Sequence, residues 1–143
     1  MLLMREKKQI STYCGKICFG DTDAGGVVYY AQYLYFLEAA RMKLLQDINF
    51  PHHQLISKFG LGFVVSDVEI HYKKSLKVED EFKIELSLGE IGRVFFEVNH
   101  VIYNQNLVVN SGKVKLVCVD WQSGKPSSLP EIFLEAIKTS QNK

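Results

Sequence analysis

The stretch Phe19–Arg41, FGDTDAGGVVYYAQYLYFLEAAR, decides how the rest of the chain is arranged. Two carboxylates, Asp21 and Asp23, precede Gly25–Gly26, and no proline interrupts the pattern until Pro51. This order predicts a polar loop followed by a helix. A helix start offers unpaired amide N–H groups and partial positive charge, so it attracts a polarised carbonyl oxygen or a phosphate. A carboxylate beside such donors can attack a carbonyl carbon or activate water against it.

A helix is predicted from about Tyr30 to Ile48, because apolar residues recur there with the 3.6-residue period. The recurring positions are Tyr33, Phe36, Leu37, Ala40, Leu44 and Ile48. At about 1.5 Å per residue this helix would be nearly 30 Å long. Its opposite side is also apolar, since Leu34, Met42 and Leu45 flank Glu38. We therefore expect a central helix, or one that lies near a subunit interface.

The pattern changes to a period of two from Phe63 onward, which is typical of half-buried strands. Runs at 67–72, 81–88, 93–103 and 113–121 are separated by short polar turns, so we expect antiparallel neighbours. The sequence also predicts a first strand at 13–19, a short helix or ordered loop at 52–59 and a terminal helix at 130–138. This is an α+β layout, in which one long helix covers an antiparallel sheet.

The composition is that of a soluble globular protein, with 143 residues, 47% hydrophobic and 23% charged residues, and a net charge of +1. We expect a single domain spanning 1–143 and no nucleic acid or membrane partner. The apolar start of the chain is too short for a signal peptide, so a cytoplasmic location is expected. The cysteines, Cys14, Cys18 and Cys118, form no C-x-x-C pair and are expected to be small buried apolar residues.

Asp21-Thr22-Asp23 invites a metal interpretation, which the sequence does not support. An EF-hand loop beginning at Asp21 would need an oxygen-bearing side chain at its fifth position and a Glu at its twelfth, where Gly25 and Gln32 stand. A two-carboxylate Mg²⁺ site usually sits in a doubly wound parallel sheet, and the alternating strand and helix pattern of that fold is absent from the sequence. We expect neither a metal nor a cofactor.

The polar residues near the helix leave alternatives open. Either aspartate can serve as a cap or turn residue. Glu38 can form an ion pair with Arg41 or face a pocket about two turns from the helix start. The four histidines stand away from any Ser, Cys or metal-ligand pattern, so a nucleophilic triad is not supported. The basic residues Lys73, Lys74, Lys77 and Arg93 are candidates for phosphate contacts or are solvated surface charges.

Residues 21–41, DTDAGGVVYYAQYLYFLEAAR, resemble the signature of the hotdog-fold acyl-CoA thioesterases of the 4-hydroxybenzoyl-CoA thioesterase type. The same signature occurs in the Tol-Pal-associated acyl-CoA thioesterases and in the cyanobacterial 1,4-dihydroxy-2-naphthoyl-CoA hydrolases of phylloquinone biosynthesis. The resemblance implies a hotdog fold, with a five-stranded antiparallel sheet wrapped around one long central helix. It also implies a homo-oligomer, a dimer or a homotetramer, with active sites at subunit interfaces.

The resemblance also implies roles for individual residues. The catalytic carboxylate falls on Asp23, and the amides that polarise the thioester carbonyl fall on Val28, Tyr29 and Tyr30. An acid near the acyl group falls on Glu38.

The aromatic candidates for an acyl pocket are Tyr29, Tyr30, Tyr33 and Phe36, and the alternative is that they are ordinary core residues. Tyr30 and Tyr33 are the two expected in the pocket beside Glu38. Arg93 falls near the CoA phosphates, with Lys73 and Lys74 as further candidates. One departure is Tyr30, where the Tol-Pal-associated branch has His, and this favours branches with an aromatic residue there.

The function expected from these residues is hydrolysis of an acyl-CoA thioester to free acid and CoA. The expected acyl group is aromatic, with 1,4-dihydroxy-2-naphthoyl as the preferred candidate. The alternatives are a short-chain acyl-CoA thioesterase of the Tol-Pal-associated type and a non-catalytic acyl-CoA-binding hotdog protein. A hotdog dehydratase is a further rival, but it would need a His and an acid together at the site.

Overall fold

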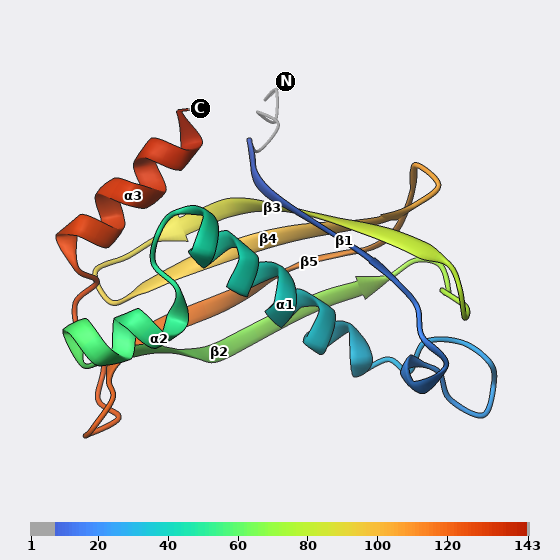
Figure 1. Ribbon diagram of the computed structural model, residues 1–143, viewed down its shortest axis with the longest axis horizontal. Coiled ribbons are helices and arrows are strands. Elements are labelled where there is room, and N and C mark those ends of the chain that lie inside the picture. Colours follow the sequence, from blue (N-terminus) through green and yellow to red (C-terminus); the bar gives the residue numbers. More distant parts are fainter. Residues whose placement is uncertain (1–7, 143) are drawn as a thin grey trace.

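One antiparallel sheet, in the strand order β1-β3-β4-β5-β2, is the framework of the computed structural model, which describes residues 8–142 (Figure 1). Its strands are β1 (Gln9–Lys16), β2 (Leu61–Tyr72), β3 (Glu81–Ile91), β4 (Phe95–Asn104) and β5 (Leu107–Asp120). Every pair of neighbouring strands is antiparallel. The expected α+β class and five-stranded antiparallel sheet are confirmed.

Helix α1 (Gln32–Asp47) crosses one face of the sheet (Figure 1). The long central helix expected from the sequence is not confirmed, because α1 has 16 residues and a length of about 24 Å. Tyr29 to Ala31 form a turn before the helix, in which the Gln32 amide donates to the Tyr29 carbonyl at 2.8 Å. The far side of α1 remains open in the protomer, since Leu34, Tyr35 and Met42 are exposed.

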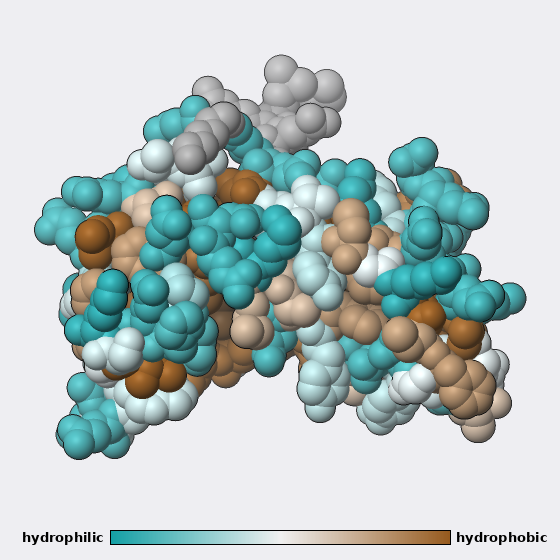
Figure 2. Space-filling model, in the orientation of Figure 1, coloured by the Kyte–Doolittle hydropathy of each residue, from teal (hydrophilic) through white to brown (hydrophobic). Residues whose placement is uncertain are grey.

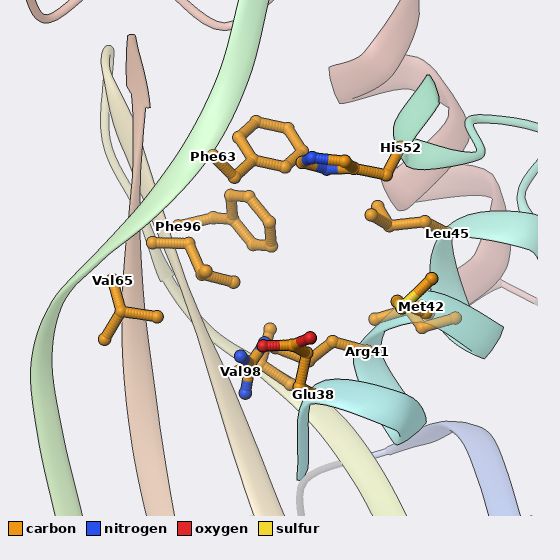
Figure 3. A pocket seen from close by; sticks show the side chains of 11 residues that line it. Glu38, Arg41, Met42, Leu45, His52, Phe63, Val65, Phe96 and Val98 are labelled. Carbon is orange, nitrogen blue, oxygen red and sulfur yellow. The ribbon is translucent and has the colours of Figure 1, made fainter. Parts of the chain in front are cut away.

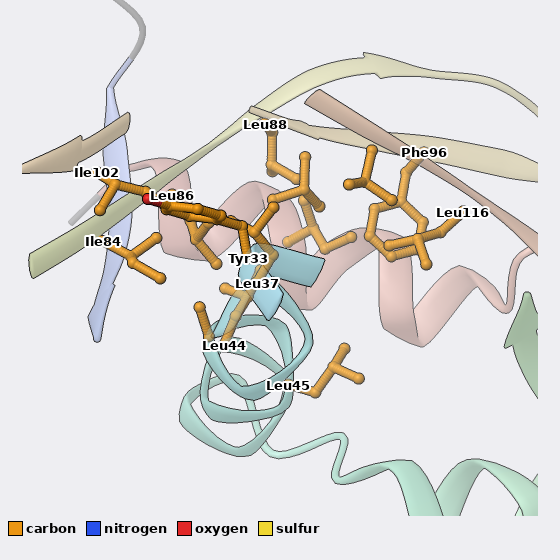
Figure 4. Close-up of a cluster of buried hydrophobic side chains, with 14 of the residues drawn as sticks. Tyr33, Leu37, Leu44, Leu45, Ile84, Leu86, Leu88, Phe96, Ile102 and Leu116 are labelled. Carbon is orange, nitrogen blue, oxygen red and sulfur yellow. The ribbon is translucent and has the colours of Figure 1, made fainter. Parts of the chain in front are cut away.

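The core lies between α1 and the inner face of the sheet. Figure 4 shows Tyr33 and Leu37 directed from α1 toward Ile84 and Leu86 of β3. Burial of a side chain such as Leu37 stabilises the fold by about 1.5–3 kcal/mol. The predicted helical stripe is largely confirmed, because Tyr33, Leu37, Ala40 and Leu44 are buried.

Strand β2 departs from the expected half-buried pattern. Val65 and Val68 are 48% and 46% exposed, although both are apolar. The reason is position in the sheet: β2 is an edge strand, and α1 approaches β1 and β3 at the opposite edge. An apolar stretch of the sheet is therefore left uncovered beside α1.

Two predicted strand boundaries shift. Strand β5 begins at Leu107, well before the predicted residue 113. The prediction starts late because Asn110 and Gly112 interrupt the alternation of apolar and polar residues in the first half of the strand. Strand β1 spans 9–16 instead of the predicted 13–19, and the last of the apolar run turns into the loop before α1.

The remaining helices are short and lie at the ends of the sheet. The predicted segment 52–59 is α2 (His52–Gln54) followed by a π-helical turn, Leu55–Phe59. Helix α3 (Glu131–Gln141) closes the chain, as the sequence predicts. Across residues 8–142, every helix falls short of the length and apolarity needed to cross a bilayer.

Candidate active site

The loop before α1 is held by Asp21. One carboxylate oxygen of Asp21 accepts the Cys18 amide at 2.8 Å, and the other accepts the Gln32 side-chain amide at 2.9 Å. The Asp21 carbonyl accepts the Tyr29 amide at 3.1 Å. Asp21 is thus the turn residue of the pair, which is the role that the sequence allowed for one aspartate.

Asp23 lies at the tip of the same loop, and its side chain is less constrained. Its Oδ1 accepts the Gly25 amide at 2.8 Å, and its backbone amide donates to the Val27 carbonyl at 2.9 Å. Within residues 8–142, Oδ2 of Asp23 accepts no hydrogen bond. The residue is exposed and lines none of the main cavities of the described chain. A single protomer therefore leaves this carboxylate open to solvent.

The structure corrects two of the three amides predicted to polarise the substrate carbonyl. The Val28 amide donates to the Leu76 carbonyl at 2.9 Å, and the Tyr29 amide donates to Asp21. Both donors are occupied because the loop pairs with neighbouring backbone. The Tyr30 amide, in contrast, finds no acceptor among the described residues, and neither does that of Ala31. The free donors thus start at Tyr30, the last of the predicted set.

A cavity of about 180 Å³ opens at the start of α1, and we call it the tyrosine cavity. Its lining includes Tyr30 and Tyr33 together with Lys73 and Lys74, so two predicted acyl-pocket residues and two predicted CoA residues meet there. Sequence reasoning missed Tyr72, whose hydroxyl donates to the Tyr30 carbonyl at 2.7 Å. The available signal was the alternation of β2, which puts Tyr72 on the inner face.

Two tyrosines near the start of α1, Tyr29 and Tyr33, have raised pKa values. Burial raises the pKa of Tyr33, with a further contribution from Tyr72. The pKa of Tyr29 is raised by its contact with the Tyr30 hydroxyl and, to a smaller extent, by Asp23. The Tyr29 and Tyr30 rings lie 4.7 Å apart between centroids. Tyr29 and Tyr33 therefore remain neutral at physiological pH.

Glu38 does not lie with Tyr30 and Tyr33. It lines a separate cavity of about 250 Å³, the Arg41 cavity, between α1 and strands β2, β4 and β5. Figure 3 shows Glu38 and Arg41 at one end of this space and His52 with Phe63 at the other. Burial lowers the pKa of Arg41, and nearby Glu38 opposes this effect. Among the described residues, Glu38 and Arg41 form no ion pair within 4.0 Å. Of the two alternatives that the sequence left open for Glu38, the structure shows the second, a side chain that lines a pocket.

Arg93 lies far from Asp23 within one protomer. It stands in the turn between β3 and β4, where its Nη1 donates to the Ser128 hydroxyl at 2.9 Å. That turn and the loop before α1 lie at opposite ends of the sheet (Figure 1). The structure thus brings Lys73 and Lys74 to the predicted site and leaves Arg93 outside it.

The described side chains show no metal-binding group. In residues 8–142, His, Cys, Asp and Glu side chains nowhere gather in threes that could hold an ion. All three cysteines are free thiols. The expected burial is confirmed for Cys118 and wrong for Cys14 and Cys18, which are exposed in β1 and in the loop that follows it.

Comparison with known proteins was made at three levels. The sequence profile of the thioesterase-like superfamily matches residues 17–137. An acyl-CoA thioesterase YbgC from Haemophilus influenzae is 34% identical over 116 residues, which cover 81% of this chain and 85% of that protein. A 1,4-dihydroxy-2-naphthoyl-CoA hydrolase from Synechococcus elongatus is 30% identical over 116 residues, with 80% and 85% coverage.

Solved structures agree with these matches. A gentisyl-coenzyme A thioesterase superposes with a TM-score of 0.81 at 28% identity, covering 88% of this chain and 98% of that one. The resemblance inferred from residues 21–41 is therefore confirmed, and with it the expected enzyme class of thioester hydrolases. The chain belongs to the thioesterase-like superfamily.

Proposed function

We propose that this protein hydrolyses an aromatic acyl-CoA thioester in the cytoplasm, with Asp23 as the catalytic carboxylate. The observation that carries the proposal is that the loop before α1 and the turn that follows it hold both a carboxylate oxygen without a donor, on Asp23, and backbone amides without an acceptor among the described residues, at Tyr30 and Ala31. These are the two elements that attack on a thioester carbonyl requires.

The reaction follows from these groups. The thioester oxygen accepts hydrogen bonds from the Tyr30 and Ala31 amides, which stabilise the negative charge that develops on it. Asp23 attacks the carbonyl carbon or removes a proton from the attacking water. The carbon–sulfur bond then breaks, and CoA leaves as a thiolate, a good leaving group because an ordinary thiol has a pKa of about 8.5. If Asp23 is the nucleophile, water then hydrolyses the anhydride that it forms with the acyl group and frees the carboxylate. On either route the products are the free acid and CoA.

A second copy of the chain is part of the proposal. Asp23 is exposed in the protomer, and next to α1 the inner face of β2 leaves Val65 and Val68 uncovered. Figure 2 shows apolar side chains at the surface of this face, including a group at the end where the loop before α1 lies. Pairing of two such faces in a dimer or tetramer would enclose Asp23. It would also let Arg93 of one copy approach the site of the other.

The choice of an aromatic acyl group rests on the tyrosine cavity. Tyr30, Tyr33 and Tyr72 give this cavity an aromatic wall, and Lys73 and Lys74 at its rim suit the CoA phosphates. Relatives named for 1,4-dihydroxy-2-naphthoyl-CoA and gentisyl-CoA support this choice, so the naphthoyl ester of phylloquinone synthesis is the first substrate to test.

The test is thiol release from a panel of aliphatic and aromatic CoA esters. Asp23→Asn keeps the acceptor for the Gly25 amide, so the loop should hold its shape while kcat falls roughly a thousandfold. Asp47→Asn, on the exposed surface of α1, is the matched control and should keep wild-type kcat.

Full activity of Asp23→Asn would remove Asp23 from the mechanism. Preference for short aliphatic esters would favour the short-chain thioesterase. Tight ester binding by the wild-type protein without thiol release would favour the non-catalytic binder. The exposure of Asp23 in the protomer is compatible with that alternative.

A further inference from the structure

We propose that Asp21 and Gln32 form a positioning pair that fixes the free amides of Tyr30 and Ala31 relative to Asp23. The pair touches neither substrate nor reacting atoms, and it acts through the loop. This inference rests on the proposed function, because the amides and Asp23 have to be the reacting groups for their positions to matter.

The geometry of Asp21 is the first observation. Its backbone carbonyl holds the amide of Tyr29 at 3.1 Å, and its Oδ1 holds the side chain of Gln32 at 2.9 Å. These two partners stand immediately before and after Tyr30 and Ala31. Asp21 is therefore hydrogen-bonded to the chain on both sides of the unpaired Tyr30 and Ala31 amides.

The second observation is how Asp21 is itself anchored. Its Oδ2 accepts the Cys18 amide at 2.8 Å, directly after the end of β1. The Asp21 carboxylate therefore links Cys18, which follows β1, to Gln32, the first residue of α1. A carboxylate near a helix start is also favoured by the partial positive charge there.

The Tyr72 hydroxyl also contacts this segment, donating to the Tyr30 carbonyl at 2.7 Å, and other contacts lie closer to the tip of the loop than the Asp21–Gln32 pair. Thr22 bridges to Val28 and Val27 bridges to Lys77, which closes the loop around Asp23. Asp23 itself is tied to Gly25 and Val27. These bonds shape the tip. Among residues 8–142, Asp21 is the only loop residue whose side chain is hydrogen-bonded to α1. Loss of that bond should shift the amides relative to Asp23 without unfolding the loop.

The chemistry of the pair allows a reversal test. In Gln32→Glu, a second carboxylate faces Asp21 and the bond is replaced by repulsion. In the double variant Asp21→Asn with Gln32→Glu, the asparagine oxygen can still accept the Cys18 amide while its NH₂ donates to the new glutamate. The hydrogen bond is thereby restored with its direction reversed.

We expect Gln32→Glu to lower kcat by about ten- to a hundredfold, since small misplacements of reacting groups have effects of this size. KM for the CoA ester should change less than threefold and the thermal midpoint should fall by no more than a few degrees. The double variant should recover most of kcat. Gln46→Glu places the same substitution on the exposed end of α1 and should leave kcat unchanged.

The outcomes separate this inference from the proposed function. If Asp23→Asn is inactive but Gln32→Glu keeps wild-type kcat, the positioning role is wrong and the proposed function stands. Failure of the double variant to recover kcat would refute the pairing. A loss of kcat matched by an equal loss of folded protein would show a purely structural role. Wild-type turnover by Asp23→Asn would instead overturn the proposed function.

Discussion

Asp21 and Asp23 are residues of the same type, two positions apart, and hydrogen bonding gives them different roles. Both side-chain oxygens of Asp21 accept hydrogen bonds, from the Cys18 amide and from Gln32. In the described part of the chain, only one side-chain oxygen of Asp23 accepts a hydrogen bond, from the Gly25 amide. A carboxylate needs a free oxygen to act on a substrate, so the structure supports Asp23 as the reactive member.

A prediction at this scale concerns Glu79, which has φ of 73° in the loop before β3. The left-handed region costs a residue with a Cβ about 1–2 kcal/mol, whereas glycine there avoids the clash at an entropic cost of about 0.5–1 kcal/mol. Glu79→Gly should therefore raise the free energy of unfolding by about 0.5–1 kcal/mol, measured by urea denaturation. Glu81→Gly, in β3 at negative φ, is the control and should be destabilising.

His100 gives a prediction on pH dependence. Burial lowers its pKa, and the charges of Arg41 and His71 lower it further, while its hydrogen bond to Asn110 at 2.9 Å opposes the shift. The folded state thus binds fewer protons at this site than the unfolded state. Stability from this source is present above the unfolded pKa of about 6.5 and is lost as the pH falls below it.

The measurement is urea denaturation at pH 7 and pH 5. His100→Gln should reduce the loss of stability between these values, by no more than about 1.4 kcal/mol per pH unit. His71→Gln is the matched control, because His71 is exposed, and it should keep most of the wild-type dependence. An identical pH dependence in His100→Gln and wild type would show that His100 does not titrate in this range.

At the scale of elements, strands β2 and β5 approach each other closely at Gly112. Gly112 of β5 pairs with Ile70 of β2 and lies under the ring of His100. A Cβ at Gly112 would overlap the carbonyl oxygen of Glu69. The approach of the two strands therefore depends on the absence of a side chain at this position.

Gly112→Ala should destabilise the protein by about 3 kcal/mol, because the clash is with backbone and cannot be relieved by a rotamer change. Thermal unfolding followed by circular dichroism would measure the effect. Gly20→Ala is the comparison, since a Cβ there meets nothing within 4 Å and should be tolerated. Equal midpoints for the two variants would mean that β2 and β5 can separate at little cost.

At the scale of the whole molecule, one side of the sheet is covered unevenly. Helix α1 approaches β1 and β3, and it leaves the edge strand β2 with apolar side chains in solvent. An apolar edge strand is a surface onto which another chain can add. The same face carries the open side of α1, which matches the proposal of a second copy that completes the site.

The prediction is that Val68→Lys prevents self-association and lowers kcat. Val68 is 46% exposed in the protomer, so lysine there should be compatible with folding, and lysine on an edge strand opposes strand pairing. Sedimentation should give an oligomer for the wild type and a monomer for the variant. Ile132→Lys, at a position 55% exposed on α3, should keep the wild-type mass and activity. If Val68→Lys keeps the wild-type mass and activity, an interface along β2 is excluded.

The sequence by itself determined the class of fold and the elements that build it. The stripe through Tyr33, Leu37 and Leu44 predicted the buried side of α1, and alternation predicted β3 and β4 to within a few residues. The motif around Asp23 pointed to the family. Such signals are local, because helical and extended backbone each impose a fixed spacing on the side chains that become buried.

The tertiary structure alone decided which groups meet. It showed that the Val28 amide is occupied by Leu76 and that Tyr72 contacts Tyr30. It also separated Glu38 from the tyrosine cavity and placed Arg93 at the far end of the sheet. The Val28–Leu76 and Tyr30–Tyr72 contacts join segments more than 40 residues apart, and the spacing of apolar residues carries no information about such pairing.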